Sequence, residues 1–246
     1  MSIKSKVLAA EATLTLVGGV GVAGALTAGT ASAATPSCGN SCINVFSHQF
    51  GTHKSPNYVV DVLRQGEKVG QPIILFRTAN FDPAEDWTVA FQGTVADFFA
   101  AGLVSAAVNL HYGGGAAGFP NDPAFENEYA PFGVDSGLCL GVAATAFNDE
   151  GVTLQQCGVS SKTVWIVDTF DSPTTLFNGY VPLINGSDTN FSHPFVLTYP
   201  NNSFPTDTPR PQLTVTNITG SSKGHGPVLG TVNVNQLWGA TFGVLK

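Results

Sequence analysis

Short apolar runs, separated by glycine, proline and polar residues, recur along the chain after residue 42. Runs rich in β-branched and aromatic residues with this punctuation predict strands. Phe98–Ala107 is the only patch with a helix-like pattern, and the alternation within Val104–His111 favours a strand over its second half. The pattern therefore predicts an all-β protein. The predicted strands are Ile43–Phe46, Tyr58–Leu63, Pro72–Phe76, Trp87–Phe91, Val104–His111, Val152–Gln156, Thr163–Val167, Phe195–Tyr199, Gln212–Thr216 and Thr231–Val234.

The three tryptophans, Trp87, Trp165 and Trp238, are almost evenly spaced, and each follows a similar pair of apolar runs. A β unit that cannot bury its apolar face alone, present three times, predicts closure into a pseudo-threefold barrel. Three ordinary core tryptophans in a β-sandwich are the alternative, which explains their burial but not their matching flanks. The paired runs are Val59–Val62 with Ile73–Leu75, Cys139–Val142 with Val152–Leu154, and Val196–Tyr199 with Leu213–Val215.

Composition and charge narrow the function classes. The 246 residues are 43% hydrophobic and 11% charged, with 28 Gly and 15 Pro, which excludes a coiled coil, collagen and a disordered chain. The net charge of −7 leaves no basic surface with which to neutralise a phosphate backbone, so nucleic acid is not an expected partner.

The N-terminal residues have the pattern of a secretory signal. Lys4 and Lys6 precede the apolar run Leu14–Ala28, and Ala31–Ala33 offers small residues for cleavage. A membrane anchor is the weaker alternative because the run is short and rich in glycine, and no later segment is long enough to span a bilayer. We therefore expect a secreted, extracellular and, from its Ala/Gly-rich leader, bacterial protein with no membrane insertion after cleavage. The expected parts are a signal peptide over 1–33, a short segment over 34–42 and one domain over 43–246, with repeats at about 43–93, 94–168 and 169–244.

The cysteine count fits this compartment. Four cysteines in an exported chain are expected to pair, and three connectivities exist. Short sequence separations favour Cys38 with Cys42 and Cys139 with Cys157. A metal site at Cys38 and Cys42 would lack a second ligand pair nearby.

The segment from Leu138 to Trp165 resembles one repeat of the ricin-type β-trefoil lectins. That repeat runs Cys-Leu-Asp-Val, then Val-Gln-Leu-x-x-Cys, then Gln-x-Trp, and Asn235–Trp238 matches its last motif in the third copy. The resemblance covers about 43–244 and implies a β-trefoil in which Cys139–Cys157 links two strands of the second repeat. It also implies a sugar pocket built from an Asp, an Asn-Gln pair and a stacking aromatic ring.

No copy retains a complete pocket of that kind. The first has Asp61 and the aromatic Phe76, but Ile74 and Ala84–Glu85 replace its other polar residues. The third has Asn235 and Gln236 but threonines elsewhere, and the second has none of the expected residues. The ligand-binding candidates are therefore Asp61, Phe76, Asn235 and Gln236. The structural alternatives are turn capping by Asp61 and hydrogen bonding around Trp238 by Asn235 and Gln236.

The second copy is longer than the others, mainly in the Gly-rich segment Gly113–Phe132. Long loops on a rigid barrel often carry binding, and aromatic residues are common anchors for protein partners. Phe119, Phe125 and Tyr129 are the partner-binding candidates. The alternative is an Ω-loop packed by its own side chains.

The sequence offers little for catalysis. It contains no Gly-x-Ser-x-Gly, His-Glu-x-x-His or phosphate-binding glycine loop, so we expect neither an enzyme nor a cofactor. Asp82, Glu85 and Asp86 are a set of oxygens that could serve Ca²⁺, but a solvated turn is the favoured interpretation and no metal is expected.

These observations predict a secreted, non-catalytic recognition or adaptor module that docks a secreted or surface protein through loops. The short segment Ala34–Cys42 ahead of a compact barrel resembles the layout of adaptor subunits of secreted actinobacterial umbrella toxin particles, which favours a place in a toxin-type complex. A glycan-binding lectin with a degraded pocket near Asp61 and a β-trefoil protease inhibitor are the alternatives.

Overall fold

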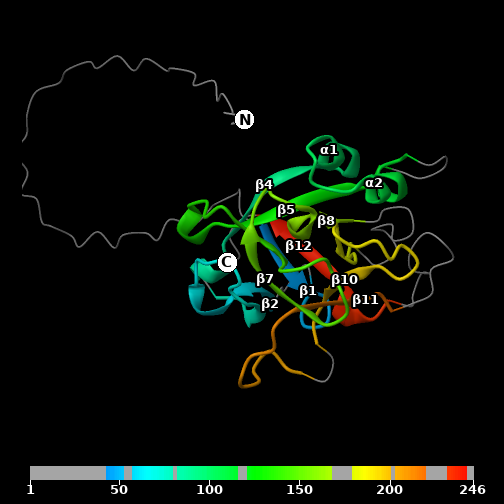
Figure 1. The fold of residues 1–246 in the computed structure, drawn as a ribbon. Coiled ribbons are helices and arrows are strands. Elements are labelled where there is room, and N and C mark those ends of the chain that lie inside the picture. The colour runs from blue at the N-terminus through cyan, green and yellow to red at the C-terminus, as the bar shows by residue number, and fades with distance from the viewer. Residues whose placement is uncertain are drawn as a thin grey trace, which may run out of the picture. The chain divides into compact units, whose positions relative to one another are not determined.

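The computed structural model describes residues 43–52, 57–79, 82–115, 121–167, 179–200, 203–219 and 232–242. These residues form twelve strands and two short α-helices (Figure 1). None of the described helices is long and apolar enough to cross a membrane. The strands are β1 (Ile43–Ser47), β2 (Tyr58–Val62), β3 (Ile73–Arg77), β4 (Trp87–Thr94), β5 (Pro123–Tyr129), β6 (Leu138–Val142), β7 (Glu150–Gln156), β8 (Trp165–Ile166), β9 (Ile184–Asn185), β10 (Phe195–Thr198), β11 (Thr214–Asn217) and β12 (Trp238–Phe242).

The twelve strands fall into three units of four, β1–β4, β5–β8 and β9–β12. In each unit the second and third strands form an antiparallel hairpin. The outer strands pair between units, β4 with β5, β8 with β9 and β12 with β1, so the three units close on themselves. The hairpins also join in a ring, through backbone hydrogen bonds from Leu154 N to Gln71 O, from Val152 N to Leu213 O and from Leu213 N to Ile73 O.

One side-chain hydrogen bond repeats in all three units. Each unit's tryptophan is the first residue of its fourth strand, lies fully buried, and donates its indole N–H to a backbone carbonyl of the same unit's second strand. This repetition, together with the ring of hairpins, makes the fold a β-trefoil and confirms the expected equivalence of the tryptophans. The bonds join Trp87 to Val60 at 3.0 Å, Trp165 to Leu140 at 2.9 Å and Trp238 to Leu197 at 2.8 Å.

The predicted disulfide of the second unit is confirmed. Cys139 on β6 is bonded to Cys157, the residue after β7, with a Cα–Cα distance of 5.1 Å. The bond therefore joins the two arms of one hairpin. Cys38 and Cys42 lie outside the described residues, so their pairing stays a prediction.

The segment between β4 and β5 differs from the sequence-based expectation. The predicted strand Val104–His111 is wrong, because Ala106–Tyr112 forms helix α2, capped by the Ser105 side chain, which accepts a hydrogen bond from Val108 N at 3.2 Å. Helix α1 (Val95–Ala100) precedes it and begins with a capping box between Thr94 and Asp97. Both caps satisfy amides that a helix end leaves unpaired, which outweighs the short alternating pattern.

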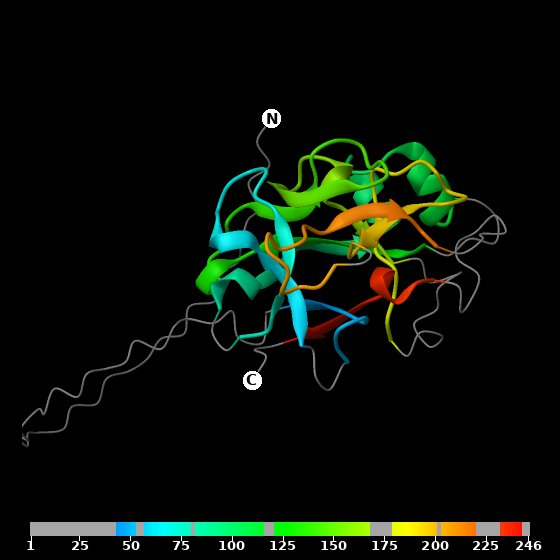
Figure 2. The ribbon, with the colours of Figure 1, turned by 90° about the horizontal axis from the view of Figure 1, so that it is seen from below.

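The predicted long loop Gly113–Phe132 contains strand β5, which pairs with β4 along its whole length. The sequence does not predict this strand because the strand contains acidic residues. In the structure Glu126 and Glu128 are buried and accept backbone hydrogen bonds from Gly158 and Gly137. In the described part of the chain, the insertion that breaks the threefold symmetry is therefore the pair of helices α1 and α2 between β4 and β5. It lies at one end of the barrel strands in both ribbon views (Figures 1 and 2).

The predicted strand Thr231–Val234 is also wrong within its described residues, Val232–Val234. Val234 begins the 3-10 turn η6 (Val234–Gln236), and its side chain is half exposed. The turn places Asn235 and Gln236 directly before Trp238, where both are buried. The backbone conformation here is determined by polar side chains that make hydrogen bonds inside the protein. It is not determined by the alternation typical of a strand.

Candidate functional site

A pocket of about 530 Å³ opens beside the first hairpin. Its walls are the end of β2 and the turn after it (Asp61–Gln65), Phe76 on β3, Ala84 of the turn η3 (Pro83–Glu85) with Asp82 before that turn, and the segment Asp207–Arg210. We call it the first-repeat pocket. It contains Asp61 and Phe76, two of the four ligand-binding residues predicted from the sequence.

Local backbone geometry holds the walls in place. Arg64 and Gln65 have φ angles of 57° and 54°, left-handed values that turn the chain sharply after β2. Asp82 caps η3 by accepting a hydrogen bond from Ala84 N at 3.0 Å. The same carboxylate oxygen accepts a hydrogen bond from Gln65 Nε2 at 3.2 Å, which connects the two turns.

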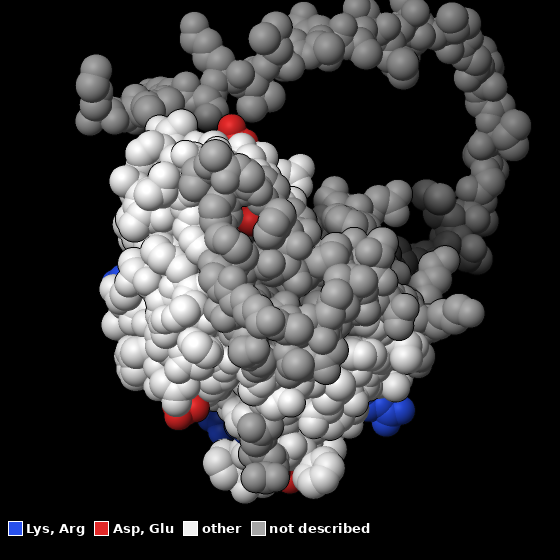
Figure 3. Space-filling model, turned by 90° about the vertical axis from the view of Figure 1, so that its right-hand side faces the viewer, with Lys and Arg blue, Asp and Glu red and all other residues white. Residues whose placement is uncertain are grey.

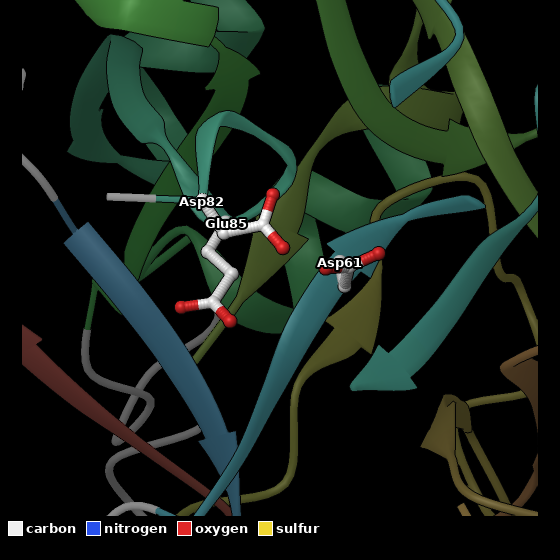
Figure 4. A group of neighbouring side chains, drawn as sticks. All are labelled: Asp61, Asp82 and Glu85. Atoms are coloured by element: carbon white, nitrogen blue, oxygen red, sulfur yellow. The ribbon is translucent and has the colours of Figure 1, made fainter. Parts of the chain in front are cut away.

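Three carboxyl groups lie close together at this pocket, and two of them, those of Asp61 and Asp82, line it. Asp61 projects from β2, while Asp82 and Glu85 project from η3 and its cap (Figure 4). One oxygen from each lies within 4.8 Å of the other two. Asp61 is 3% exposed and Glu85 is 4% exposed, so the predicted solvated turn is wrong for Glu85. We call these three residues the acidic cluster.

Burial determines the electrostatics of the acidic cluster. It raises the pKa of Asp61 to about 8, with a further increase from the nearby Asp82 charge and a smaller opposing effect of Arg210. Burial likewise raises the pKa of Glu85 to about 8, opposed by the hydrogen bond from Ala79 N and reinforced by the surrounding carboxylates. At neutral pH, therefore, the protein holds these two groups largely protonated unless a cation neutralises them.

Phe76 does not present a free ring to the pocket. The Arg210 guanidinium lies 3.8 Å from the centre of the Phe76 ring, within the range of a cation–π contact. A sugar that stacked on this face would have to displace Arg210. The structure thus brings Asp61 and Phe76 together as the sequence predicts, but with an arginine where the sugar ring would lie.

The other two predicted ligand-binding residues belong to the third repeat. Gln236 Oε1 accepts hydrogen bonds from the backbone N–H and the hydroxyl of Thr219, both at 2.8 Å. Its Nε2 donates to Thr216 Oγ1 at 2.9 Å and to Asn217 O at 3.0 Å. Asn235 Nδ2 donates to Tyr199 O at 2.7 Å. These bonds support the structural interpretation of both residues, although a pocket of about 460 Å³ lies beside them.

Glu85 and Gln236 occupy equivalent positions, two residues before the tryptophans of their repeats. Glu85 Oε1 accepts a hydrogen bond from Ala79 N at 2.9 Å, as Gln236 Oε1 does from Thr219 N. In the second repeat the buried Glu126 accepts the corresponding backbone hydrogen bond, from Gly158 N. The fold therefore uses one side-chain oxygen at this place in every repeat. Sequence reasoning missed the burial of Glu85, and the alignment with Gln236 was the signal that could have revealed it.

The two described partner-binding candidates, Phe125 and Tyr129, lie on strand β5 and not on a loop. Tyr129 is fully buried and packs against Trp87 at 5.7 Å between ring centres, so the prediction that it anchors a partner is wrong. Phe125 lies on β5 opposite Trp165 and packs against the core. Phe119 lies outside the described residues. Exposed apolar side chains near this segment include Phe99 on α1, Leu110 on α2 and Phe132 in the turn after β5.

The sequence matches no protein-family model, and it matches no curated protein. Among solved structures it is similar to the designed threefold-symmetric protein ThreeFoil, with 12% identity, a TM-score of 0.47, and coverage of 81% of this chain and 96% of ThreeFoil. It is similar to the Rhizoctonia solani agglutinin at 13% identity and a TM-score of 0.46, covering 82% and 95% of the two chains. A mosquitocidal holotoxin has 14% identity and a TM-score of 0.47; the match covers 82% of this chain but only 17% of the toxin.

Proposed function

We propose that this chain is a secreted, non-catalytic recognition module that docks a partner protein through the α1–α2 insertion on its β-trefoil scaffold. The observation that carries the proposal is the exposure of large apolar side chains on two helices that the threefold repeat does not require. Phe99 is 42% exposed and Leu110 is 56% exposed.

The insertion is firmly attached, so it can present these side chains in a fixed arrangement. Val95 and Phe98 of α1 pack with Val108 and Tyr112 of α2 in one buried apolar cluster. Phe98 also packs against Phe91 of β4 at 4.5 Å between ring centres. A preformed apolar surface binds a partner with a smaller loss of conformational entropy than a flexible loop does.

The surroundings of the insertion favour an apolar, weakly charged partner surface. A hollow of about 340 Å³ at the C-terminal end of α1 is lined by Ala90, Phe91, Ala101 and Leu103, together with Cys157, Gly158 and one acid, the buried Glu126. Charged side chains are few and scattered on the described part of the face in Figure 3. The cores of protein interfaces are depleted of charge in the same way and contain aromatic anchors.

Glycan binding is the weaker proposal for this chain. Arg210 covers the stacking face of Phe76, and the polar groups of Gln236 are bonded within the protein. A sugar pocket needs both a free aromatic face and free polar groups that point into it. Inhibition of a protease stays a prediction from the sequence.

The secreted location and the type of partner rest on the sequence. The leader over 1–33 supports export from a bacterium, and the short segment Ala34–Cys42 ahead of the barrel supports a subunit of a toxin-type complex. The partner we propose is therefore another secreted or surface protein that exposes an apolar patch.

Affinity capture from the source culture supernatant tests this function. Bait carrying Phe99→Ser and Leu110→Ser is expected to lose the protein that wild-type bait retains, because truncating an interface anchor typically costs more than ~2 kcal/mol. Phe147→Ser is the matched control, since Phe147 is 54% exposed but lies on the turn between β6 and β7. Capture that is equal for the double variant and wild type contradicts docking by the insertion. Binding to a glycan array that disappears with Asp61→Ala would instead indicate a lectin.

A further inference from the structure

We propose that the acidic cluster of Asp61, Asp82 and Glu85 is a calcium-binding site. This inference is independent of the protein-docking function, because it concerns the first-repeat pocket and not the α1–α2 insertion.

The spacing of the three carboxyl groups fits one ion. Calcium binds oxygen ligands at about 2.3–2.6 Å, so two oxygens on opposite sides of the ion lie roughly 4.8 Å apart. One oxygen from each of the three side chains lies within 4.8 Å of the others. All three ligands are therefore within reach of a single central ion without movement of the backbone.

Asp61 provides a second observation that points to a missing ligand. Its Oδ2 atom is enclosed and has no hydrogen-bond partner among the described residues. Arg210, the basic residue whose charge acts on Asp61, makes its close contact with Phe76 instead. A buried carboxylate oxygen without a partner is costly, and direct coordination of a cation would remove that cost.

The third repeat shows that the fold does not need two acids at this place. Thr198 and Gln236 occupy the positions of Asp61 and Glu85 in the third repeat. Gly141 and Thr163 occupy them in the second. The pair of the third repeat is uncharged and its hairpin still forms. The second repeat has one buried acid here, Glu126, and both Gly158 N and Thr163 Oγ1 donate to its carboxylate. The two buried acids of the first repeat exceed what either other repeat uses, and cation binding supplies an explanation for them.

The oxygens that are free support the same conclusion. Glu85 uses Oε1 for the backbone bond to Ala79, and in the described part of the chain its Oε2 has no hydrogen bond. Asp82 uses Oδ1 for Ala84 and Gln65, which leaves its Oδ2 available. Asp82 and Glu85 therefore each keep one carboxylate oxygen outside the structural hydrogen bonds. Calcium takes six to eight oxygens, and water in the open pocket would supply the remainder.

Calcium suits the site better than magnesium. The ligands are all oxygens. A strand and a short turn supply them, and these two elements do not arrange the oxygens as an octahedron. Magnesium demands near-ideal octahedral geometry and keeps most of its water, whereas calcium accepts irregular sites. The bound ion would connect β2 to η3, the turn that leads directly into the buried Trp87.

Isothermal titration of the metal-free protein with CaCl₂ tests the site. We expect saturable binding with one ion per chain and a Kd between about 10⁻⁴ and 10⁻³ M, the range of extracellular calcium modules. Glu85→Gln is the sharpest variant, because it reproduces the residue of the third repeat and retains the oxygen that accepts from Ala79 N. Glu85→Gln and Asp61→Asn should each weaken binding at least about tenfold.

Two controls make the result decisive. Asp149→Asn removes an exposed charge outside the pocket, at a left-handed position that asparagine tolerates, and should leave calcium affinity unchanged. Circular dichroism should show that all three variants are folded. No saturable binding by wild type, or unchanged binding in both Glu85→Gln and Asp61→Asn, overturns the proposal. Equal affinity for MgCl₂, or an equal loss with Asp149→Asn, would also overturn it by indicating a diffuse negative field.

Discussion

The guanidinium of Arg210 lies 3.8 Å from the centre of the Phe76 ring, at the mouth of the first-repeat pocket. Phe76 is the residue that a sugar would stack on, and the arginine occupies that face. Arg210 comes from the segment before β11, far along the chain from β3, so the third repeat covers the aromatic ring of the first.

Replacing Arg210 with alanine should reveal whether this contact suppresses sugar binding. A cation–π contact contributes about 0.5–1 kcal/mol, so Arg210→Ala should lower the free energy of unfolding only slightly. On a glycan array, wild type should bind no sugar more tightly than millimolar, because the ring is covered and Ile74 offers no polar group. Arg77→Ala, which removes an exposed arginine from the end of β3, is the control for loss of charge. Micromolar binding of a sugar by wild type would contradict this prediction.

The acidic cluster should make stability depend on pH when divalent cations are chelated. The pKa values of Asp61 and Glu85 are raised to about 8 in the folded chain, so the folded state retains protons that the unfolded state has released. The retained protons therefore stabilise the folded state. Their contribution to the free energy of unfolding is complete below the ordinary pKa values of these side chains, and it is lost as the pH rises through 8. Urea titrations in EDTA should therefore give a free energy of unfolding that decreases across this interval. Glu85→Gln should make the free energy of unfolding depend less steeply on pH. An unchanged dependence would show that burial does not raise the pKa values of these groups.

The sequence predicted the framework of the fold because its signals are local and repeated. The spacing of Trp87, Trp165 and Trp238 and the hairpins before them depend on alternation that reads directly as strand. Helix α2 was missed because Val104–His111 alternates over too short a span, and the capping signals at Thr94 and Ser105 are the better guide. Strand β5 was hidden by acids that are buried against backbone amides, an arrangement that only the tertiary contacts create.

The sequence also predicted part of the candidate site, where the signals are local. Asp61 and Phe76 were identified through the resemblance of the first hairpin to a ricin-type lectin repeat, whose sugar pocket has an Asp and an aromatic residue at these positions. The contact of Arg210 with Phe76 and the burial of Glu85 depend on chain segments that meet only after folding. No local pattern marks the contact of Arg210 with Phe76, whereas the alignment of Glu85 with Gln236 before the tryptophans is a signal for the burial of Glu85.

Removing the disulfide should destabilise the second repeat. Cys139 and Cys157 are separated by 18 residues, and closing a loop of this size restricts the unfolded chain by about 3 kcal/mol. The double variant Cys139→Ala/Cys157→Ala should therefore lose about 2–4 kcal/mol of unfolding free energy in denaturant titration. Adding reductant to this variant should change its stability little, unless residues 38 and 42 also carry a stabilising bond. A loss below about 1 kcal/mol would contradict the entropic estimate.

The three tryptophan hydrogen bonds should be energetically equivalent. Each Trp→Phe variant leaves a buried carbonyl without its indole donor and also creates a small cavity, which together cost about 2–4 kcal/mol. Trp87→Phe, Trp165→Phe and Trp238→Phe should therefore show similar losses in chemical denaturation. A variant with almost no loss would indicate that its repeat contributes little to the closed barrel.

Replacing Phe125 with alanine should lower the stability of the protein without removing its recognition of the partner. Its ring belongs to β5 and packs against the core opposite Trp165, so Phe125→Ala should lower the free energy of unfolding by about 3 kcal/mol, as truncation of a packed aromatic does. Below its melting temperature the variant should still capture the partner, because Phe99 and Leu110 remain exposed on the insertion. Thermal unfolding and affinity capture should be measured on the same preparation. Loss of capture by a folded Phe125→Ala protein, with capture intact in Phe99→Ser/Leu110→Ser, would move the docking surface from the helices to strand β5.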